Sequence, residues 1–132
     1  MAEVSDPIAV VIVEDNDVFR ESLELLLGVV PDLDVVAAVP DGRSALEVCQ
    51  RFRPDVVLMD YRLPELDGVE TTAAIGEAWP STAVVVLTAT AETEEIDALY
   101  EAGAVACLTK DRELDEIVGA VRDAAGRGAA LR

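Results

Sequence analysis

Five short and nearly continuous apolar runs recur along the chain, each bounded by residues that favour turns. They cover residues 8–13, 33–39, 55–59, 83–88 and 104–109 and are rich in valine. Apolar runs of this length without alternating polar positions are typical of strands that are buried on both faces of a parallel sheet. The pattern therefore predicts five parallel strands.

Segments with helical periodicity lie between these runs. In three of them the apolar residues repeat on one face, and we expect each set to pack on the sheet. These sets are Val18, Phe19, Leu23, Leu26 and Leu27; Ala45, Val48, Cys49 and Phe52; and Leu114, Ile117, Val118, Val121 and Ala125. Residues 69–75 and 96–100 carry weaker helical patterns. Prolines and glycines separate the segments, as expected at element boundaries.

Five strands that alternate with five helices predict an α/β fold. The expected architecture is a (βα)5 three-layer sandwich with right-handed crossovers. At this size the likeliest arrangement is flavodoxin-like, with a parallel five-stranded sheet in the order 2-1-3-4-5. The 132 residues suffice for one core. We expect one domain over residues 7–125, and a flexible tail or the start of a linker over residues 126–132.

Composition excludes several classes of function. No apolar stretch approaches the roughly 20 residues of a membrane span, and the first residues lack the features of a signal peptide, so a cytoplasmic protein without membrane segments is expected. The chain has no histidine, which excludes Ser-His-Asp catalysis and imidazole metal sites. The net charge of -17 disfavours direct binding to nucleic acid. Cys49 and Cys107 lack metal-ligand spacing and are interpreted as reduced thiols.

Polar residues follow four of the five predicted strands. Glu14 and Asp15 follow the first, Asp60 the third, Thr88 ends the fourth, and Lys110 follows the fifth. The carboxyl ends of parallel strands meet at one edge of the sheet, where three carboxylates would repel one another unless they shared a cation. Mg²⁺ suits such an open acidic cluster. Each residue also has an ordinary structural role, as a helix cap, strand residue or surface charge, but their convergence favours a phosphoryl site with Asp60 as nucleophile.

Four segments resemble the motifs of one family, the receiver domain of bacterial two-component response regulators. They are "VIVEDN", "VVLMDYRLPELDG", "VVVLTAT" and "GAVACLTKD", and the resemblance covers residues 7–125. It implies that Asp60 is phosphorylated and that Thr88 and Lys110 contact phosphoryl oxygens. It also implies that Glu14, Asp15, Asp60 and the backbone carbonyl of Arg62 hold Mg²⁺. Asp111 after the lysine resembles the regulators with a LuxR/NarL-type output.

The resemblance also implies partners. Since the chain has no histidine, the phosphoryl donor must be another molecule, a sensor histidine kinase or a small acyl or amido phosphate. A phosphorylation-linked homodimer is compatible with such a domain. Contact with DNA, and hence control of transcription, is expected only through an output domain beyond Arg132. The chain is not expected to be an enzyme, beyond catalysing its own phosphorylation and dephosphorylation.

Three positions depart from the family pattern or tune it. Cys107 stands where the family commonly has an aromatic residue that moves on phosphorylation, so we expect the response to run mainly through the loop after Thr88 or through residues 91–103. Tyr100 could substitute for this aromatic, although its spacing favours a helix face. Arg62 and Thr90 occupy positions beside the chemistry, and we expect the bulk of Arg62 to slow hydrolysis of the acyl phosphate.

Several alternatives stay open. A pseudo-receiver would keep the fold as an interaction module that is not phosphorylated, and a stand-alone regulator would lack an output domain. A haloacid-dehalogenase-like phosphatase also uses an aspartate nucleophile, but it needs a second acid where this chain has Arg62. A nucleotide-binding module is disfavoured because no glycine-rich loop follows the first strand.

Overall fold

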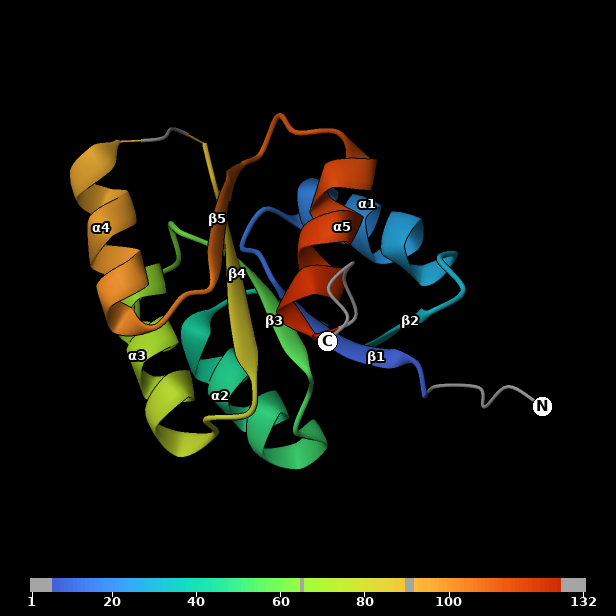
Figure 1. Cartoon of the computed structure of the whole chain (residues 1–132), viewed down its shortest axis with the longest axis horizontal. Coiled ribbons are helices and arrows are strands. Elements are labelled where there is room, and N and C mark those ends of the chain that lie inside the picture. Colours follow the sequence, from blue (N-terminus) through green and yellow to red (C-terminus); the bar gives the residue numbers. More distant parts are fainter. Residues whose placement is uncertain (1–5, 65, 90–91, 127–132) are drawn as a thin grey trace.

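The computed structural model describes residues 6–64, 66–89 and 92–126, and strands alternate with helices throughout (Figure 1). The strands are β1 (Ile8–Val13), β2 (Leu33–Val39), β3 (Val56–Asp60), β4 (Ala83–Thr88) and β5 (Ala106–Thr109). The helices are α1 (Asp17–Gly28), α2 (Gly42–Phe52), α3 (Gly68–Ala78), α4 (Thr93–Ala102) and α5 (Leu114–Ala124). The predicted alternation is confirmed, with β3 and β5 starting one and two residues later than expected.

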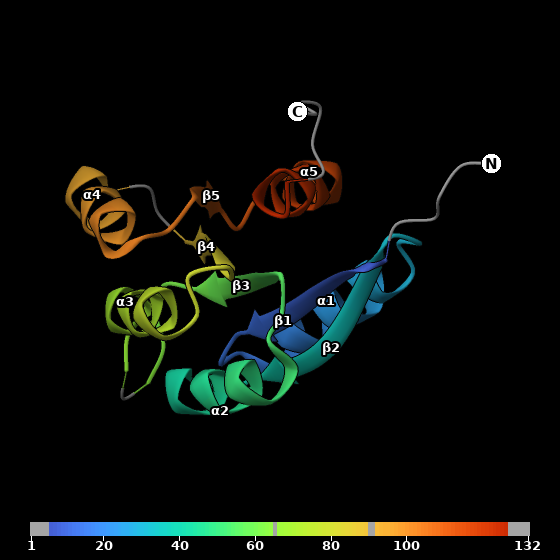
Figure 2. The same cartoon turned by 60° about the horizontal axis from the view of Figure 1, so that its bottom comes forward.

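All strand pairs are parallel, and the order across the sheet is β2-β1-β3-β4-β5. Helices α1 and α5 cover one face, whereas α2, α3 and α4 cover the other (Figure 2). The prediction of a flavodoxin-like three-layer sandwich is therefore confirmed. Within the described residues, no helix combines the length and the apolar character needed to cross a membrane.

The core consists of two apolar clusters, one on each face of the sheet. In β1, Ile8, Val10 and Ile12 pack toward α1 and α5, whereas Val11 and Val13 pack toward α2, α3 and α4. Successive side chains of a strand point to opposite faces, so a strand covered by helices on both sides needs apolar residues at every position. This explains the continuous valine-rich runs.

The helix α1 buries less of its apolar face than the sequence pattern indicates. Leu23 and Leu27 are buried, but Val18 is 75% exposed and Leu26 is 47% exposed. Residues four apart lie above one another on a helix, and the line through Phe19, Leu23 and Leu27 is the one that faces the sheet. The prediction that Val18 and Leu26 belong to the core was therefore wrong.

The end of α2 requires the same correction. Phe52 is 42% exposed, while Ala45 and Cys49 are fully buried. Phe52 is the last residue of the helix, beyond the part that lies on the sheet, and its ring instead faces the guanidinium of Arg51 at 5.5 Å.

Helix α5 is tied to the chain near both of its ends. At its start, the side chain of Glu116 faces Arg112 at 2.9 Å. Near its end, Arg122 makes a two-pronged ion pair with Asp32, with both hydrogen bonds at 2.8 Å. Asp32 lies directly before β2, and its carbonyl accepts a hydrogen bond from Ile8. The helix thus runs antiparallel to the strands, from the end of the sheet where β5 finishes to the end where β2 starts (Figure 1).

Candidate functional site

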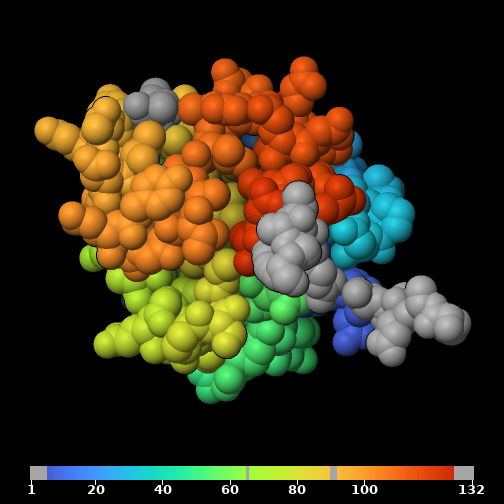
Figure 3. Space-filling view, in the orientation of Figure 1, coloured from blue at the N-terminus to red at the C-terminus, as the bar shows by residue number. Residues whose placement is uncertain are grey.

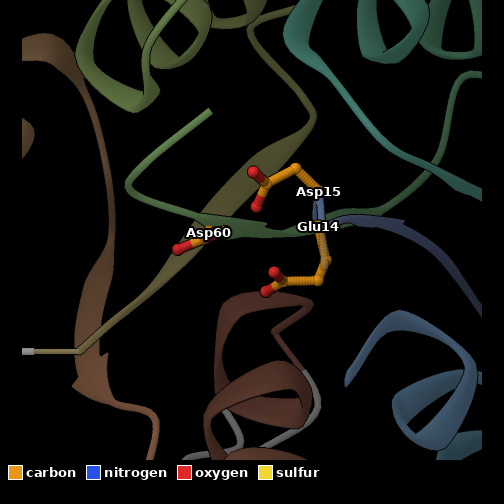
Figure 4. Close-up of side chains that lie close together, drawn as sticks. All are labelled: Glu14, Asp15 and Asp60. Carbon is orange, nitrogen blue, oxygen red and sulfur yellow. The ribbon is translucent and has the colours of Figure 1, made fainter. Parts of the chain in front are cut away.

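Three carboxylates meet at the carboxyl ends of β1 and β3. Glu14, Asp15 and Asp60 each offer an oxygen, and these oxygens all lie within 4.8 Å of one another (Figure 4). Glu14 is 1% exposed and Asp60 is 5% exposed, whereas Asp15 is exposed. The apolar residues of both strands hold the backbone in the core, so the residues that end the strands are held at the rim. The structure therefore brings together the three acids that the sequence placed at this edge.

Lys110 reaches this cluster from the end of β5. Its Nζ lies 3.0 Å from Glu14 Oε1 and 3.3 Å from Asp60 Oδ1. Burial alone would lower the pKa of Lys110, but the bond to Glu14 and the charges of Asp60 and Glu14 raise it instead. The ring of Phe19 in α1 faces the ammonium at 4.9 Å. Lys110 therefore stays charged and bridges the two buried acids.

The carboxylate of Asp60 is unusually basic. Burial is the largest cause, and the negative charge of Glu14 adds to it, so the pKa rises from 3.8 to about 6. Lys110 and the backbone N–H of Arg62, which donates to Asp60 Oδ1 at 3.3 Å, oppose this rise. Asp60 is therefore predominantly ionised above neutral pH, although its charge is poorly solvated.

Thr88 lies on the neighbouring strand at the same edge. It is the last residue of β4 and is 5% exposed. Asp60 pairs in register with Leu87, and the carbonyl of Thr88 accepts a hydrogen bond from the backbone N–H of Lys110 at 2.8 Å. Thr88 thus follows the residue opposite Asp60 and connects by its backbone to Lys110. The structure therefore places Glu14, Asp15, Asp60, Thr88 and Lys110 at one edge of the sheet.

The loop after Asp60 is packed tightly against the start of α3. The backbone N–H of Gly68 donates to the carbonyl of Tyr61 at 2.9 Å. A Cβ atom at Gly68 would lie only 2.8 Å from that carbonyl oxygen, so this close approach requires glycine. Asp67 caps α3 in a capping box with Glu70. The hydrogen bond from Gly68 thereby fixes the start of the loop at Tyr61, directly after Asp60.

The side chain of Arg62 points toward helix α4. Its guanidinium lies 5.7 Å from the Tyr61 ring and 3.9 Å from the carboxylate of Glu95. Burial raises the pKa of Tyr61, and the charge of Glu95 raises it further. Thr90, which we expected beside the chemistry, lies outside the described residues.

Two residues that the sequence reasoning missed support the acidic pair. Asn16, rather than Glu14 or Asp15, caps α1, and its side chain accepts a hydrogen bond from the N–H of Phe19 at 2.8 Å. Arg20 in the first turn of α1 donates to the backbone carbonyl of Glu14 at 2.8 Å. The sequence shows an arginine five residues after Asp15, in "EDNDVFR", but a bond to a backbone carbonyl leaves no pattern of side chains by which to recognise it.

The donor set fits a hard divalent cation. Three carboxylates converge, and in the part of the chain that the structure describes this is the group able to hold a metal ion. Oxygen donors in an open, partly exposed arrangement match the preference of Mg²⁺. Burial and the charge of Glu14 raise the pKa of Asp60, and a cation bound at this cluster would favour its ionised form.

Cys107 lies in β5 on the face toward α4. It is half-buried and packs against the second cluster, and it forms no disulfide. Burial raises the pKa of its thiol, while a contact with the hydroxyl of Tyr100 acts in the opposite direction. Tyr100 itself is 48% exposed. The Tyr100 ring thus lies on the surface of α4, next to the cysteine.

Comparison with models of protein families matches residues 10–122 to the response regulator receiver domain. Transcriptional regulatory protein LnrK from Bacillus subtilis is 40% identical over 114 residues, covering 86% of this chain and 52% of that protein. Transcriptional regulatory protein DegU from Brevibacillus brevis is 34% identical over 122 residues, covering 92% of this chain and 52% of that protein. This chain therefore spans about half the length of these relatives.

Among solved structures, the signal receiver domain of the putative response regulator NarL from Mycobacterium tuberculosis is similar throughout. It superposes with a TM-score of 0.88 at 35% sequence identity, over 92% of this chain and 98% of that one. The similarity thus extends over most of this chain and nearly all of that receiver domain.

Proposed function

The chain belongs to the response regulator receiver domain family, and from this membership and the geometry of the site we propose that Asp60 accepts a phosphoryl group from a sensor histidine kinase. The kinase would supply a phosphohistidine, because this chain has no histidine. An oxygen of Asp60 attacks phosphorus, the P–N bond to the kinase imidazole breaks, and an acyl phosphate forms. Later attack by water breaks the P–O bond and returns the carboxylate and inorganic phosphate.

The residues around Asp60 support each part of this transfer. Lys110 already lies 3.3 Å from the Asp60 carboxylate, from where its ammonium can pair with a phosphoryl oxygen. Thr88 offers a hydroxyl donor at the same edge. Mg²⁺, held by Glu14, Asp15, Asp60 and the backbone carbonyl of Arg62, would supply positive charge for the phosphoryl oxygens during transfer.

The observation that carries the proposal is the position of Asp60, a buried carboxylate that shares one cluster with two acids and an ammonium group. Incubation with acetyl phosphate and Mg²⁺, followed by intact-mass measurement, tests it. We expect one added phosphoryl group in the wild-type chain and none in Asp60→Asn. Asp97→Asn, a change at an exposed acid on α4, serves as the matched control and should be modified like the wild type.

The second candidate is a pseudo-receiver that acts by binding alone. Cys107, in place of an aromatic residue, favours this reading, because the usual side chain that moves with phosphorylation is absent from its position. The same mass experiment separates the two functions. A chain that stays unmodified under conditions where Mg²⁺ binds would support the pseudo-receiver and refute the phosphoacceptor.

We further propose that this domain controls transcription through an output domain, because its relatives DegU and LnrK are transcriptional regulatory proteins. Contact with DNA would then belong to the output domain, and a homodimer could form when Asp60 is phosphorylated. A stand-alone regulator is the alternative. The domain limits of 7–125, a linker role for residues 126–132 and a cytoplasmic location remain predictions. Residues 127–132 lie outside the described part of the chain.

A further inference from the structure

Arg20 makes two short hydrogen bonds from the first turns of α1. One nitrogen of its guanidinium donates to the backbone carbonyl of Glu14 at 2.8 Å, and the other donates to Asp17 Oδ1 at 2.7 Å. The Arg20 side chain is only 17% exposed, whereas that of Asp17 is 78% exposed. Arg20 therefore bridges a solvent-facing carboxylate to a carbonyl at the base of the acidic cluster.

The contact matters because of where this carbonyl lies. The C=O of Glu14 belongs to the peptide group that connects Glu14 to Asp15, so its direction sets the direction of the next residue. The other polar atoms of Glu14 are also held: its N–H donates to Val39, Oε2 accepts from Asn16, and Oε1 faces Lys110. Arg20 holds the remaining polar group, the carbonyl. Removal of Arg20 would free this carbonyl while the N–H and both carboxylate oxygens of Glu14 keep their contacts.

We propose that Arg20 is a positioning residue, which orients the Glu14–Asp15 peptide so that both carboxylates face the cation shared with Asp60. The inference rests on the proposed Mg²⁺ site and adds to it a residue that touches neither the cation nor the phosphoryl group. Charge-assisted hydrogen bonds to groups behind a metal ligand commonly change metal affinity by about 10- to 100-fold when they are removed.

A positioning role and a simple charge effect predict opposite results for one variant. Arg20→Met removes a positive charge close to the cluster, so electrostatics alone would tighten Mg²⁺ binding. Loss of orientation would instead weaken it. Arg20→Lys keeps the charge, but a single ammonium cannot reproduce the fork with which arginine reaches two acceptors. If only charge matters, Arg20→Lys should bind Mg²⁺ as tightly as the wild type. If Arg20 positions the peptide, Arg20→Lys should bind Mg²⁺ more weakly.

The test is titration of the purified chain and its variants with MgCl₂ by isothermal calorimetry, alongside thermal unfolding in EDTA. We expect about tenfold weaker Mg²⁺ binding for Arg20→Met and a smaller loss for Arg20→Lys. Arg51→Met, an equal change of charge at an exposed position of α2, should bind Mg²⁺ within twofold of the wild type. Because Arg20→Lys retains the stem and charge, it provides a folded variant if Arg20→Met unfolds.

Three outcomes are distinguishable. Weaker binding by both Arg20 variants, with cooperative unfolding retained, supports the inference. Binding as tight as in the wild type, or tighter for Arg20→Met, overturns it and leaves the proposed function standing, even if the unfolding temperature falls. Absence of Mg²⁺ binding by the wild type would refute the cation site of the proposed function and this inference together.

Discussion

Asp60 is the residue at which function and stability conflict. Its carboxylate is buried beside Glu14, and the pKa of about 6 means that ionisation is less favourable in the folded chain than in the unfolded one. A raised carboxyl pKa makes the folded state lose stability as pH rises through the interval between the two values. At neutral pH, Asp60→Asn should therefore raise the free energy of unfolding, by up to about 3 kcal/mol.

Urea unfolding at neutral pH in EDTA measures this effect. Asp15→Asn is the matched comparison, because it removes the same charge from the exposed member of the cluster, and it should change stability less. A lower unfolding free energy for Asp60→Asn would show that the ion pair with Lys110 outweighs the cost of burial.

Arg62 tests whether a side chain beside the site sets the lifetime of the acyl phosphate. Its guanidinium is exposed and lies near the Tyr61 ring and Glu95, while its backbone N–H donates to Asp60. Arg62→Ala should open a path for water and increase the rate of autodephosphorylation by several fold, corresponding to about 1 kcal/mol of barrier. Decay of the phosphorylated mass after removal of acetyl phosphate measures this, and a rate equal to that of the wild type would contradict the steric explanation.

The individual site residues differ in how far the sequence could identify them. Asp60 and Glu14 follow apolar runs, so the end of each run placed them at the sheet edge. Arg20 was not predictable in this way, because its partner is a backbone carbonyl, which has no side-chain signature. The opposite burial of Glu14 and Asp15 was also hidden, since it depends on which of two adjacent acids turns toward Lys110.

Helix α2 depends on one titrating cap. Asp41 accepts a hydrogen bond from the backbone N–H of Ser44 at 2.7 Å, and this bond, followed by one from the Ser44 side chain, lowers the pKa of Asp41 below its usual 3.8. A lowered carboxyl pKa adds stability above the unfolded value, and this stability is lost as pH falls through the folded value. Asp41→Ala should cost about 1 kcal/mol at neutral pH.

Denaturant unfolding between pH 7 and pH 3 tests this prediction for the cap. The difference between the wild type and Asp41→Ala should shrink below pH 3.8. Asp41→Asn retains a capping side chain that does not titrate, so it should stay close to the wild type at neutral pH. A difference that does not vary with pH would mean that the charge of Asp41 contributes nothing.

Helix α4 is the element we expect to respond to phosphorylation. Its N-cap residue Glu92 makes no side-chain capping bond, and Leu99 is its one fully buried residue among those described. A helix with few anchors opens at low cost in free energy. Addition of Mg²⁺ and beryllofluoride should change amide exchange across Thr93–Ala102 in the wild type but not in Asp60→Asn. The original expectation also included residue 91, which lies outside the described residues.

Amide exchange measured by mass spectrometry decides the matter, with α5 as the internal reference because it begins with a capping box. Unchanged protection in α4 would exclude it as the responding element. Helices α4 and α5 lie on either side of β5 on the face of the molecule in Figure 3. Amide exchange can therefore be compared between two helices that flank the same strand.

The net charge of the whole molecule opposes folding. A charge of -17 over 132 residues concentrates like charges when the chain becomes compact, and salt screens them with a Debye length of roughly 10 Å at 0.1 M. Raising NaCl from 50 to 500 mM should therefore increase the unfolding temperature by a few degrees. Salt also weakens the exposed ion pairs, but these pairs contribute little stability, so their loss is smaller than the gain from screened repulsion. Calorimetric scans in NaCl and KCl should agree, and a falling unfolding temperature would contradict this balance.

At the scale of the whole molecule, the fold was the feature that could best be predicted from the sequence. Residues 8–13 and 83–87 are apolar at each position, as expected of strands covered on both faces. The order of the strands was predicted from the commonest arrangement of five parallel strands with right-handed crossovers. Prediction was poorer for Val18, Leu26 and Phe52, because periodicity shows which residues are apolar but not how wide a strip of the helix the sheet covers.

Helix α5 has an ion pair near each of its ends, so a movement at its start is resisted at its far end. The helix begins four residues after Lys110 and, at 11 residues, is about 16 Å long. A tilt of about 5° at its start would move its last turn by roughly 1.4 Å, more than the roughly 0.5 Å per axis by which an ordered backbone vibrates. The Arg122–Asp32 pair restrains that turn against β2. A movement of α5 that starts near the site would therefore have to stretch these two hydrogen bonds, which lie at the opposite end of the helix.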